Sequence, residues 1–496
     1  MHEYPTILHV LFRHARDIPG KTAVIESETG LECTYRELWA YLTLFAKRLG
    51  AAGVRRDSGD GYGTRVVVRC EQTIDYIVAM LAVQLAGGVF VPVENNIAEA
   101  RIIEIMEETD SYVLIAVNPL SNHNYTYIPI AEACTGVNDI ETYDVVLPDP
   151  DTLAIILFTT GTTGKSKGVM HTGKSFTARF LSFYDFFYHD DEQVYIIPVP
   201  LSHALGLNRV CLSIYAKCTM VLLDGFSMIK RFFSAVKTYN GTILCLVSFA
   251  VELYLRTCRN ELMDIRNQIT CLDIASSYSE AQITALREIF PESRIIQAYA
   301  ATEIHGCYVD HSKQKYKPMC LGSPCDGTDL VFFDEQKEAI IEATCEHPGL
   351  IAMKSDTKML GYWKNPELTE NVTRGEYIVL SDWGYKGSDG LYYYLARADE
   401  VIISGAYKIA PAEIEEAANS FKGIKESACV PISDPLMGQV PKLFVVMEKD
   451  YSFNAGDIYK YLQSKLEGTK LPRHIEEIDR IPRSGIKINR MGLREL

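Results

Sequence analysis

Residues 159–168 combine hydroxyl, glycine and lysine side chains in a way that suits a polyphosphate ligand. The stretch holds four threonines, one serine, three glycines and two lysines. Glycine lets backbone N–H groups turn toward one ligand, hydroxyls donate hydrogen bonds, and lysine supplies positive charge. A solvated flexible loop is the alternative interpretation. The apolar run at 153–158 predicts a buried strand directly before the loop, and two lysines in that position favour the phosphate site.

The spacing of the loop differs from that of a Walker-type phosphate loop. That motif needs four residues between its first glycine and its Gly-Lys-Ser/Thr end, whereas two residues separate Gly161 from Gly164. The residue types at 168–172 predict extended backbone directly after the loop, so we expect no helix N-terminus there to bind a phosphate. The sequence therefore predicts a phosphate-binding loop of a different kind.

Further motifs follow in a fixed order along nearly the whole chain. They are 81–92 (LAVQLAGGVFVP), 159–168 (TTGTTGKSKG), 299–303 (YAATE), 361–367 (GYWKNPE), 381–384 (SDWG), 397–400 (RADE), 408–415 (KIAPAEIE) and 482–487 (PRSGIK). This series resembles the adenylate-forming superfamily of acyl- and aryl-CoA ligases, peptide-synthetase adenylation domains and luciferases. Within it, the pattern is nearest to coumarate-type acid–CoA ligases.

The resemblance implies a two-step reaction. In that superfamily a carboxylate attacks the α-phosphate of MgATP to give an acyl-adenylate and pyrophosphate, and a thiol then displaces AMP. Such chemistry needs neutralised phosphate charge, a positioned carboxylate and a metal. The resemblance therefore implies ATP and Mg²⁺ as cofactors and CoA as co-substrate.

The resemblance also implies the residues that hold the nucleotide. Glu303 coordinates Mg²⁺, Thr302 bonds the α-phosphate, and Tyr299 lies against the adenine. Asp382 accepts both ribose hydroxyls, and Lys487 bridges the attacking carboxylate and the α-phosphate. The full implied ATP- and AMP-binding set is Thr159, Thr160, Gly161, Thr162, Thr163, Gly164, Lys167, Ala275, Ser276, Gln297, Ala298, Tyr299, Thr302, Asp382, Arg397 and Lys487.

The resemblance also implies residues that bind the acyl group, residues that face the thiol, and a residue about which the small domain rotates. Asp399 is the implied hinge, about which the small domain turns between the two half-reactions. His203 joins Lys487, Thr302 and Glu303 in the implied catalytic set, as a residue that gates and positions more than it titrates. The implied acyl pocket and thiol face are His203, Ala204, Leu205, Phe249, Ala250 and Ala300, and Ser404, Gly405 and Lys408.

Four places depart from the family pattern. Ser166 replaces a proline, and Ala300 replaces a glycine. Residues 273–279 stand where the family has a glycine-rich turn, and the lysine loop at 484–487 is one residue shorter than usual. Because the shorter loop carries Lys487, weak adenylation or a nucleotide-binding member without turnover stays open as an alternative.

The substrate class follows from what residues 200–208 lack. Peptide-synthetase domains place an aspartate there to pair with an amino group, and this stretch has no carboxylate. An aryl or short- to medium-chain acid is therefore favoured over an α-amino acid. Apolar pockets discriminate by only about 1–3 kcal/mol per methylene, so the acid itself stays open. A stand-alone enzyme that loads a carrier-protein phosphopantetheine is the alternative to a CoA ligase.

The composition and the net charge restrict the classes of partner that the chain is expected to bind. The chain has 496 residues, with 49 Lys+Arg against 64 Asp+Glu and a net charge of −15. An acidic chain of average globular composition argues against nucleic acid or an anionic membrane surface as the main partner. The 13 cysteines are an odd number, which argues against a disulfide framework, and they show no Cys-x-x-Cys spacing, which argues against a zinc or redox motif.

The elements that position these motifs alternate between helices and short apolar strands. Thr34 and Glu37 form a predicted capping box, and a helix at 73–86 leads through glycines into a strand at 89–93. This alternation predicts an α/β fold, with a large N-terminal domain of layered sheets and helices. We place this AMP-binding domain at 1–396 and a small mobile α+β domain carrying the lysine loop at 397–496.

The start of the chain and its longest apolar stretch bear on the cellular location of the protein and on whether it spans a membrane. No cationic segment followed by a long apolar one opens the chain. The apolar stretch at 76–93 is interrupted by Gln84, Gly87, Gly88 and Pro92. We therefore expect a cytoplasmic chain without a membrane span, with its oligomeric state open.

Overall fold

The structure is a computed structural model that describes residues 6–121, 124–136, 145–159, 166–184, 192–226, 228–275, 278–398, 400–404, 407–484 and 487–496. Within these ranges, the side chains that lie outside the description are those of Tyr407, Lys408, Thr469, Ser484, Lys487 and Met491.

The chain forms two compact units. Unit 1 comprises Met1–Lys317, Leu321–Leu330 and Met353–Ile378, and unit 2 comprises Pro318–Cys320, Val331–Ala352 and Val379–Leu496. The predicted border between residues 396 and 397 falls inside the last of these segments and stays a prediction. The mixed α/β architecture, with a large N-terminal and a smaller C-terminal part, confirms the predicted fold class.

Unit 1 contains a sheet whose centre is parallel and whose strands are buried on both faces. Val66 and Val68 point into one apolar cluster and Val67 into another, as the two-residue period of a strand requires. The strand order is β19-β8-β7-β4-β3-β5-β6. The bounds are β19 Gly361–Tyr362, β8 Lys167–Thr172, β7 Leu153–Thr159, β4 Val89–Val93, β3 Arg65–Arg69, β5 Val113–Ala116 and β6 Thr126–Pro129.

A second sheet of unit 1 brings the other motifs to its strand ends. Strands β11, β12 and β13 run parallel, and β14 returns antiparallel to β13. The order within the unit is β14-β13-β12-β11-β9-β10-β1-β2. The bounds are β14 His305–Asp310, β13 Arg294–Ala300, β12 Cys271–Ala275, β11 Ile243–Val247, β9 Val194–Ile197, β10 Thr219–Leu222, β1 Thr22–Glu26 and β2 Glu32–Thr34.

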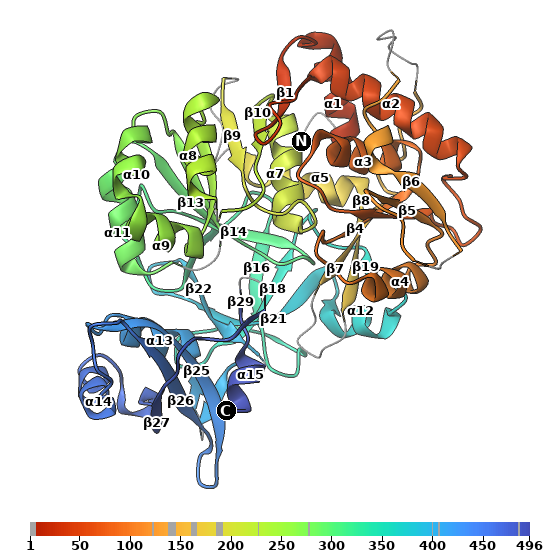
Figure 1. Cartoon of the computed structure of the whole chain (residues 1–496). Coiled ribbons are helices and arrows are strands. Elements are labelled where there is room, and N and C mark those ends of the chain that lie inside the picture. Colours follow the sequence, from red (N-terminus) through yellow and green to blue (C-terminus); the bar gives the residue numbers. More distant parts are fainter. Residues whose placement is uncertain are drawn as a thin grey trace. The chain divides into compact units, whose positions relative to one another are not determined.

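Helices cover these sheets in two groups, visible in Figure 1 as α1–α3 and α8–α11. The predicted capping box is confirmed, because Thr34 accepts from the Glu37 N–H and Glu37 bonds the Thr34 backbone in return. The bounds are α1 Ile7–Asp17, α2 Tyr35–Ala51, α3 Ile74–Leu85, α4 Glu99–Glu108, α5 Gly173–Leu181, α7 Ala204–Tyr215, α8 Ile229–Thr238, α9 Ser248–Thr257, α10 Arg259–Ile265, α11 Glu280–Ile289 and α12 Pro366–Val372, with the 3₁₀ turn η1 at Ile130–Glu132.

Unit 2 is built around the long antiparallel pair β25 (Ile424–Asp434) and β26 (Gly438–Met447). Alternate residues of β26 enter different cores, with Leu443 in one and Phe444 in the other. The other elements of this sheet and its cover are β23 Ile402–Ser404, β24 Tyr407–Ile409, β27 His474–Glu477, α13 Pro411–Asn419, α14 Ala455–Gln463, η2 Gly468–Lys470 and α15 Arg490–Arg494.

Two short paired strands flank the lysine loop predicted at 484–487. They are β28 (Arg483–Ser484) and β29 (Lys487–Ile488). The Asn489 N–H donates to the Pro482 carbonyl at 2.8 Å, which closes the hairpin at its base. Such short strands leave no hydrophobic period in the sequence.

The remaining strands complete the chain. They are β15 Cys320–Pro324, β16 Asp329–Phe333, β17 Ile340–Ile341, β18 Gly349–Lys354, β20 Thr373–Arg374, β21 Tyr377–Lys386 and β22 Tyr392–Arg397. In the part of the chain that is described, no helix combines the length and the apolar character needed to cross a membrane.

Candidate functional site

Strands β7 and β8 form the hairpin that carries the glycine- and threonine-rich loop. Thr159 pairs with Lys167 at its open end, and the Ser166 hydroxyl donates to the Thr159 carbonyl at 2.9 Å. Ser166, which stands where the family pattern has proline, thus ties the two strands together. Of the predicted phosphate-binding residues, Thr160, Gly161, Thr162, Thr163 and Gly164 lie outside the described residues.

The short strand β19 runs beside β8 and brings a tyrosine to the loop lysine. Tyr362 pairs with Val169, and the Lys167 Nζ lies 5.6 Å from the centroid of the Tyr362 ring. A Cβ on Gly168 would lie 2.9 Å from the Ile156 side chain and 3.2 Å from that of Trp363, the residue after β19, so glycine favours this close packing. An ammonium over an aromatic face is electrostatically attracted to it.

The turn between β13 and β14 carries Thr302 and Glu303. The Tyr362 hydroxyl donates to Glu303 Oε1 at 2.7 Å, and the Met359 N–H donates to the Glu303 carbonyl at 2.8 Å. Tyr362 therefore links the loop lysine to the predicted metal ligand. The motif containing Tyr362 was recognised in the sequence, but this contact was not foreseen.

Buried basic groups lie behind the same turn. Arg179, on α5, donates from its two terminal nitrogens to the carbonyls of Thr302 at 2.7 Å and Ala301 at 3.0 Å. His171 Nε2 lies 2.8 Å from the Thr302 carbonyl. Burial, reinforced by the charge of Arg179, lowers the pKa of His171 to about 3. His171 is therefore neutral near pH 7, and both residues were missed by sequence reasoning.

The predicted adenine-binding residues lie at one edge of the second sheet. Ile274 pairs with Gln297 across the parallel strands β12 and β13, so Ala275 and Ala298 continue at adjacent positions. The carboxyl ends of parallel strands are the usual place for a ligand in α/β sheets. Gln297 Oε1 accepts from His311 Nε2 at 2.7 Å. Of this group, Tyr299 is partly buried, and Ser276 lies outside the described residues.

The predicted acyl-pocket residues come from the starts of α7 and α9 and, for the exposed Ala300, from the end of β13. His203 directly precedes α7, and its Nε2 lies 3.3 Å from Glu94 Oε1 with 53% of its side chain exposed. Phe249 is 54% exposed, whereas Ala250 is fully buried in the core. Ala204 and Leu205 are partly buried against the core. Phe249 follows β11, whose last residue, Val247, pairs with Ala275, so it lies at the same sheet edge.

Unit 2 carries the predicted ribose-binding and thiol-face residues. Asp382 on β21 faces Arg397 on β22 as a cross-strand pair, with 3.9 Å between Asp382 Oδ1 and Arg397 Nε. Ser404 is buried at the end of β23. Asp399 and Gly405 lie outside the described residues, and of Lys408 and Lys487 the backbone strand is described but not the side chain.

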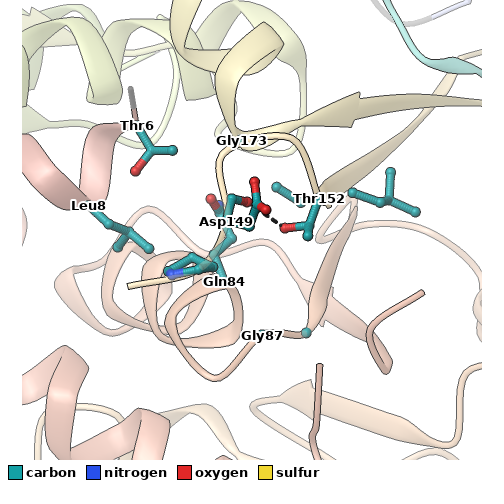
Figure 2. A pocket seen from close by; sticks show the side chains of 11 residues that line it. Thr6, Leu8, Gln84, Gly87, Asp149, Thr152 and Gly173 are labelled. Atoms are coloured by element: carbon teal, nitrogen blue, oxygen red, sulfur yellow. Dashed lines mark hydrogen bonds between the residues drawn. The ribbon is translucent and has the colours of Figure 1, made fainter. Parts of the chain in front are cut away.

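A small pocket with about 320 Å³ of open space lies elsewhere in unit 1. Figure 2 shows its labelled lining residues, with the Thr152 hydroxyl bonded to the Asp149 carbonyl at 2.7 Å. Its lining comes from the start of α1, the end of α3 and the segments flanking β7 and β8, and includes no predicted site residue. The pocket therefore carries no part of the chemistry above.

The donor set around Glu303 can be tested against magnesium. Among the residues that the structure describes, no group of three or more His, Cys, Asp or Glu side chains could hold a metal ion. Glu303 offers one partly exposed carboxylate. Magnesium at phosphate sites takes one or two protein carboxylates and completes its shell with phosphate and water oxygens. The residues present therefore fit a Mg²⁺ that arrives with a nucleotide.

Comparisons with known proteins match the whole length of the chain. The family model described as AMP-binding enzyme matches residues 11–363, and that of the AMP-binding enzyme C-terminal domain matches 413–486. Feruloyl-CoA synthase of Amycolatopsis sp. is 27% identical over 95% of both chains. Long-chain-fatty-acid–CoA ligase of Bacillus subtilis is 25% identical, over 100% of this chain and 96% of its own.

Solved structures share the fold. ATP-bound MatB from Rhodopseudomonas palustris has a TM-score of 0.87 at 21% identity, over 99% of this chain and 98% of its own. The o-succinylbenzoate CoA synthetase of Bacillus subtilis, in complex with its acyl-adenylate intermediate, has a TM-score of 0.85 at 23% identity, over 100% and 99%. The two family models confirm the superfamily inferred from the motifs. Both domain models match in order along the chain, and this protein belongs to the family of AMP-binding enzymes.

Proposed function

We propose that this chain is an AMP-forming acid–thiol ligase, which activates a carboxylic acid with ATP and transfers the acyl group to CoA. The observation that supports it best is the meeting of Lys167, Tyr362 and Glu303 beside a hydroxyl-rich loop. The names of the relatives, CoA synthases and ligases, support the same class.

In the first step, a substrate carboxylate oxygen bonds the α-phosphorus. The bond from that phosphorus to its bridging oxygen breaks, and pyrophosphate leaves with the electron pair. Lys167 and the residues at 159–164 hold the β- and γ-phosphates, and Thr302 donates to the α-phosphate. Lys487 stabilises the charge that grows between carboxylate and phosphate. When bound at Glu303, Mg²⁺ neutralises phosphate charge.

Strand-end residues orient the nucleotide for this attack. The edge formed by Ala275, Ser276 and residues 297–299 takes the adenine, with Tyr299 against the ring. Asp382 accepts from both ribose hydroxyls, because one carboxylate offers two acceptor oxygens to a vicinal diol. Arg397, its cross-strand neighbour, contacts the ribose or phosphate.

In the second step, the thiol sulfur attacks the acyl carbon. The bond from that carbon to the AMP oxygen breaks, AMP leaves, and the thiol proton passes to solvent. The stretch with Ser404, Gly405 and Lys408 lines the path of the thiol. Rotation of the 397–496 domain against the 1–396 domain, about Asp399, exchanges Lys487 for this stretch between the steps.

The acid is an aryl or a short- to medium-chain acyl acid. The pocket formed by residues 203–205, 249–250 and 300 is mostly apolar, and His203, held near Glu94, gates it. CoA is the proposed acceptor, and a carrier-protein phosphopantetheine is the other acceptor to test. We place the reaction in the cytoplasm.

The deciding experiment is pyrophosphate release from MgATP across aryl, short-chain, medium-chain and amino acids, each with and without CoA. Release that depends on one acid class, together with a CoA thioester, supports the proposal. Release without a thioester redirects the second step to a carrier protein. If no acid in the panel causes pyrophosphate release although nucleotide still binds, the result contradicts turnover and favours a nucleotide-binding member of the family.

A further inference from the structure

Arg179 is a buried arginine that forms no ion pair within 4 Å of a carboxylate among the residues that the structure describes. Only 1% of the residue is exposed. Within the described part of the chain its side chain donates to the carbonyl oxygens at 301 and 302, and one terminal nitrogen also lies 3.4 Å from His171 Nε2. Its Nε is buried without a hydrogen-bond partner there. Burying a charge and leaving one of its donors unmet costs stability, so an account based on stability alone does not explain this residue.

The contacts form a clasp around one turn. The guanidinium holds the two carbonyls that precede Glu303, while the ring of His305, two residues after Glu303, has Nδ1 2.7 Å from the Arg179 carbonyl. The Glu303 carbonyl is itself taken by the Met359 N–H at 2.8 Å. The backbone carbonyls at 301, 302 and 303 are therefore all held by named donors.

Charge adds to this geometry. Burial lowers the pKa of Arg179 to about 9, and the carboxylate of Glu303 acts in the opposite direction. The group is therefore still cationic near pH 7. This positive charge lies behind the backbone of the turn that carries Glu303, so it adds to the hydrogen bonds that hold the turn.

We propose that Arg179 is a positioning residue that fixes the Thr302–Glu303 turn for the magnesium–nucleotide complex. This inference rests on the proposed function, because it takes Glu303 as the residue that meets the metal. Arg179 touches neither metal nor substrate and acts through the two carbonyls and through its charge. Partners that orient a metal ligand in this way commonly matter almost as much as the ligand.

The test measures nucleotide binding by calorimetry, with MgATP and with ATP in a chelator, for Arg179→Met and Arg179→Lys. We expect Arg179→Met to weaken MgATP binding by about 10–100-fold while binding of metal-free ATP changes by less than about twofold. Arg179→Lys keeps the charge but cannot reach both carbonyls with a planar fork, so its loss is intermediate. Leu42→Ala, in the core of α2, is the control for a loss of thermal stability alone.

Wild-type MgATP binding in Arg179→Met overturns the inference, as does an equal loss in Leu42→Ala. If Arg179→Met does not fold, Arg179→Lys decides on the same criterion. A wild-type chain that binds ATP no better with Mg²⁺ overturns the proposed role of Glu303, and the inference with it. The two failures are thus distinguishable.

Discussion

Two arginines, one buried and one largely buried, each secure a segment that carries a predicted site residue. They differ in whether a carboxylate neutralises their charge. In unit 1, Arg179 holds the turn with Glu303 through carbonyl oxygens. In unit 2, Arg490 follows the hairpin with Lys487 and makes two bonds to the carboxylate of Glu415, one of them 3.1 Å long. Arg490 also donates to the Cys429 carbonyl at 2.9 Å.

The difference shows in the charge of each group. Burial alone would lower the pKa of Arg490, but the charge and hydrogen bonds of Glu415 outweigh it and leave that pKa raised. The pKa of Arg179 is lowered. Arg490 is neutralised by its partner and serves to hold unit 2 together. Arg179 leaves a positive charge behind the Glu303 turn, where it can act on what binds there.

Arg490→Met should have the largest effect, and it should be on stability. Removing one partner leaves Glu415 charged with only 11% of its side chain exposed, and breaking a buried pair costs about 3–5 kcal/mol. Urea unfolding measures the loss. The double variant Arg490→Met with Glu415→Leu should recover much of it. A single-variant loss under about 1 kcal/mol would mean that the pair behaves as a surface pair.

Lys487→Ala should slow catalysis and leave the hydrogen bonds between Arg490 and Glu415 intact. Losing a group that stabilises transition-state charge should slow pyrophosphate release by roughly 100-fold, while thioester formation from supplied acyl-adenylate is largely spared. The unfolding free energy should stay within about 0.5 kcal/mol. Equal loss in both half-reactions would contradict the assignment of Lys487 to the first.

In unit 1, Tyr362→Phe tests the Glu303 turn, and we expect its effect on the KM for MgATP. It removes the hydrogen bond to Glu303 but keeps the ring under Lys167. Hydrogen bonds to charged groups contribute about 1.5–3 kcal/mol, so we expect the KM for MgATP to rise about 10–100-fold. Tyr377→Phe removes a comparable bond to Asp329, outside the predicted site, and is the matched control. A KM unchanged in Tyr362→Phe, or raised equally in the control, would argue against the link.

Much of the fold and part of the site could be predicted from the sequence. Local signals sufficed for the capping box at Thr34, for β7 before the loop and for β8 after it, because each rests on neighbouring residues. The juxtaposition of Lys167 and Glu303 was implied by family motifs, and the structure brings both to Tyr362.

The missing parts depend on contacts between distant residues. An arginine in the last turn of α5 has the sequence pattern of a solvent-facing residue, and only the packing of α5 against the Glu303 turn makes Arg179 buried. In the sequence, His171 is likewise only one residue of a strand. Its importance depends on its contact with the Thr302 carbonyl, which is distant in the sequence. The apolar neighbours of Arg179, Phe176 and Phe180 in particular, were the available signal.

The smallest predicted effect is a pH dependence of stability that arises beside Arg179. His171 titrates at about 3 when folded because it is buried next to a cation, whereas an unfolded histidine titrates near 6.5. Between these values the unfolded chain binds a proton that the folded chain lacks, so stability is full above about pH 6.5 and falls as the pH falls below it. From about pH 7 to about pH 6 each such histidine should cost about 0.7 kcal/mol.

His171→Gln should remove this share of the slope in urea unfolding measured across that range. His14→Gln is the control, because burial also lowers the pKa of His14, while its Nε2 lies 3.4 Å from the carbonyl of Tyr215, which is not a predicted site residue. Both variants should flatten the slope, yet His171→Gln alone should also weaken MgATP binding, since His171 shares the Thr302 carbonyl with Arg179. If His14→Gln flattens the slope and His171→Gln does not, then His171 takes up its proton in the folded chain as readily as in the unfolded chain. The protonated ring would give the turn behind Glu303 a second cation, and the contrast with the neutralised Arg490 would be larger.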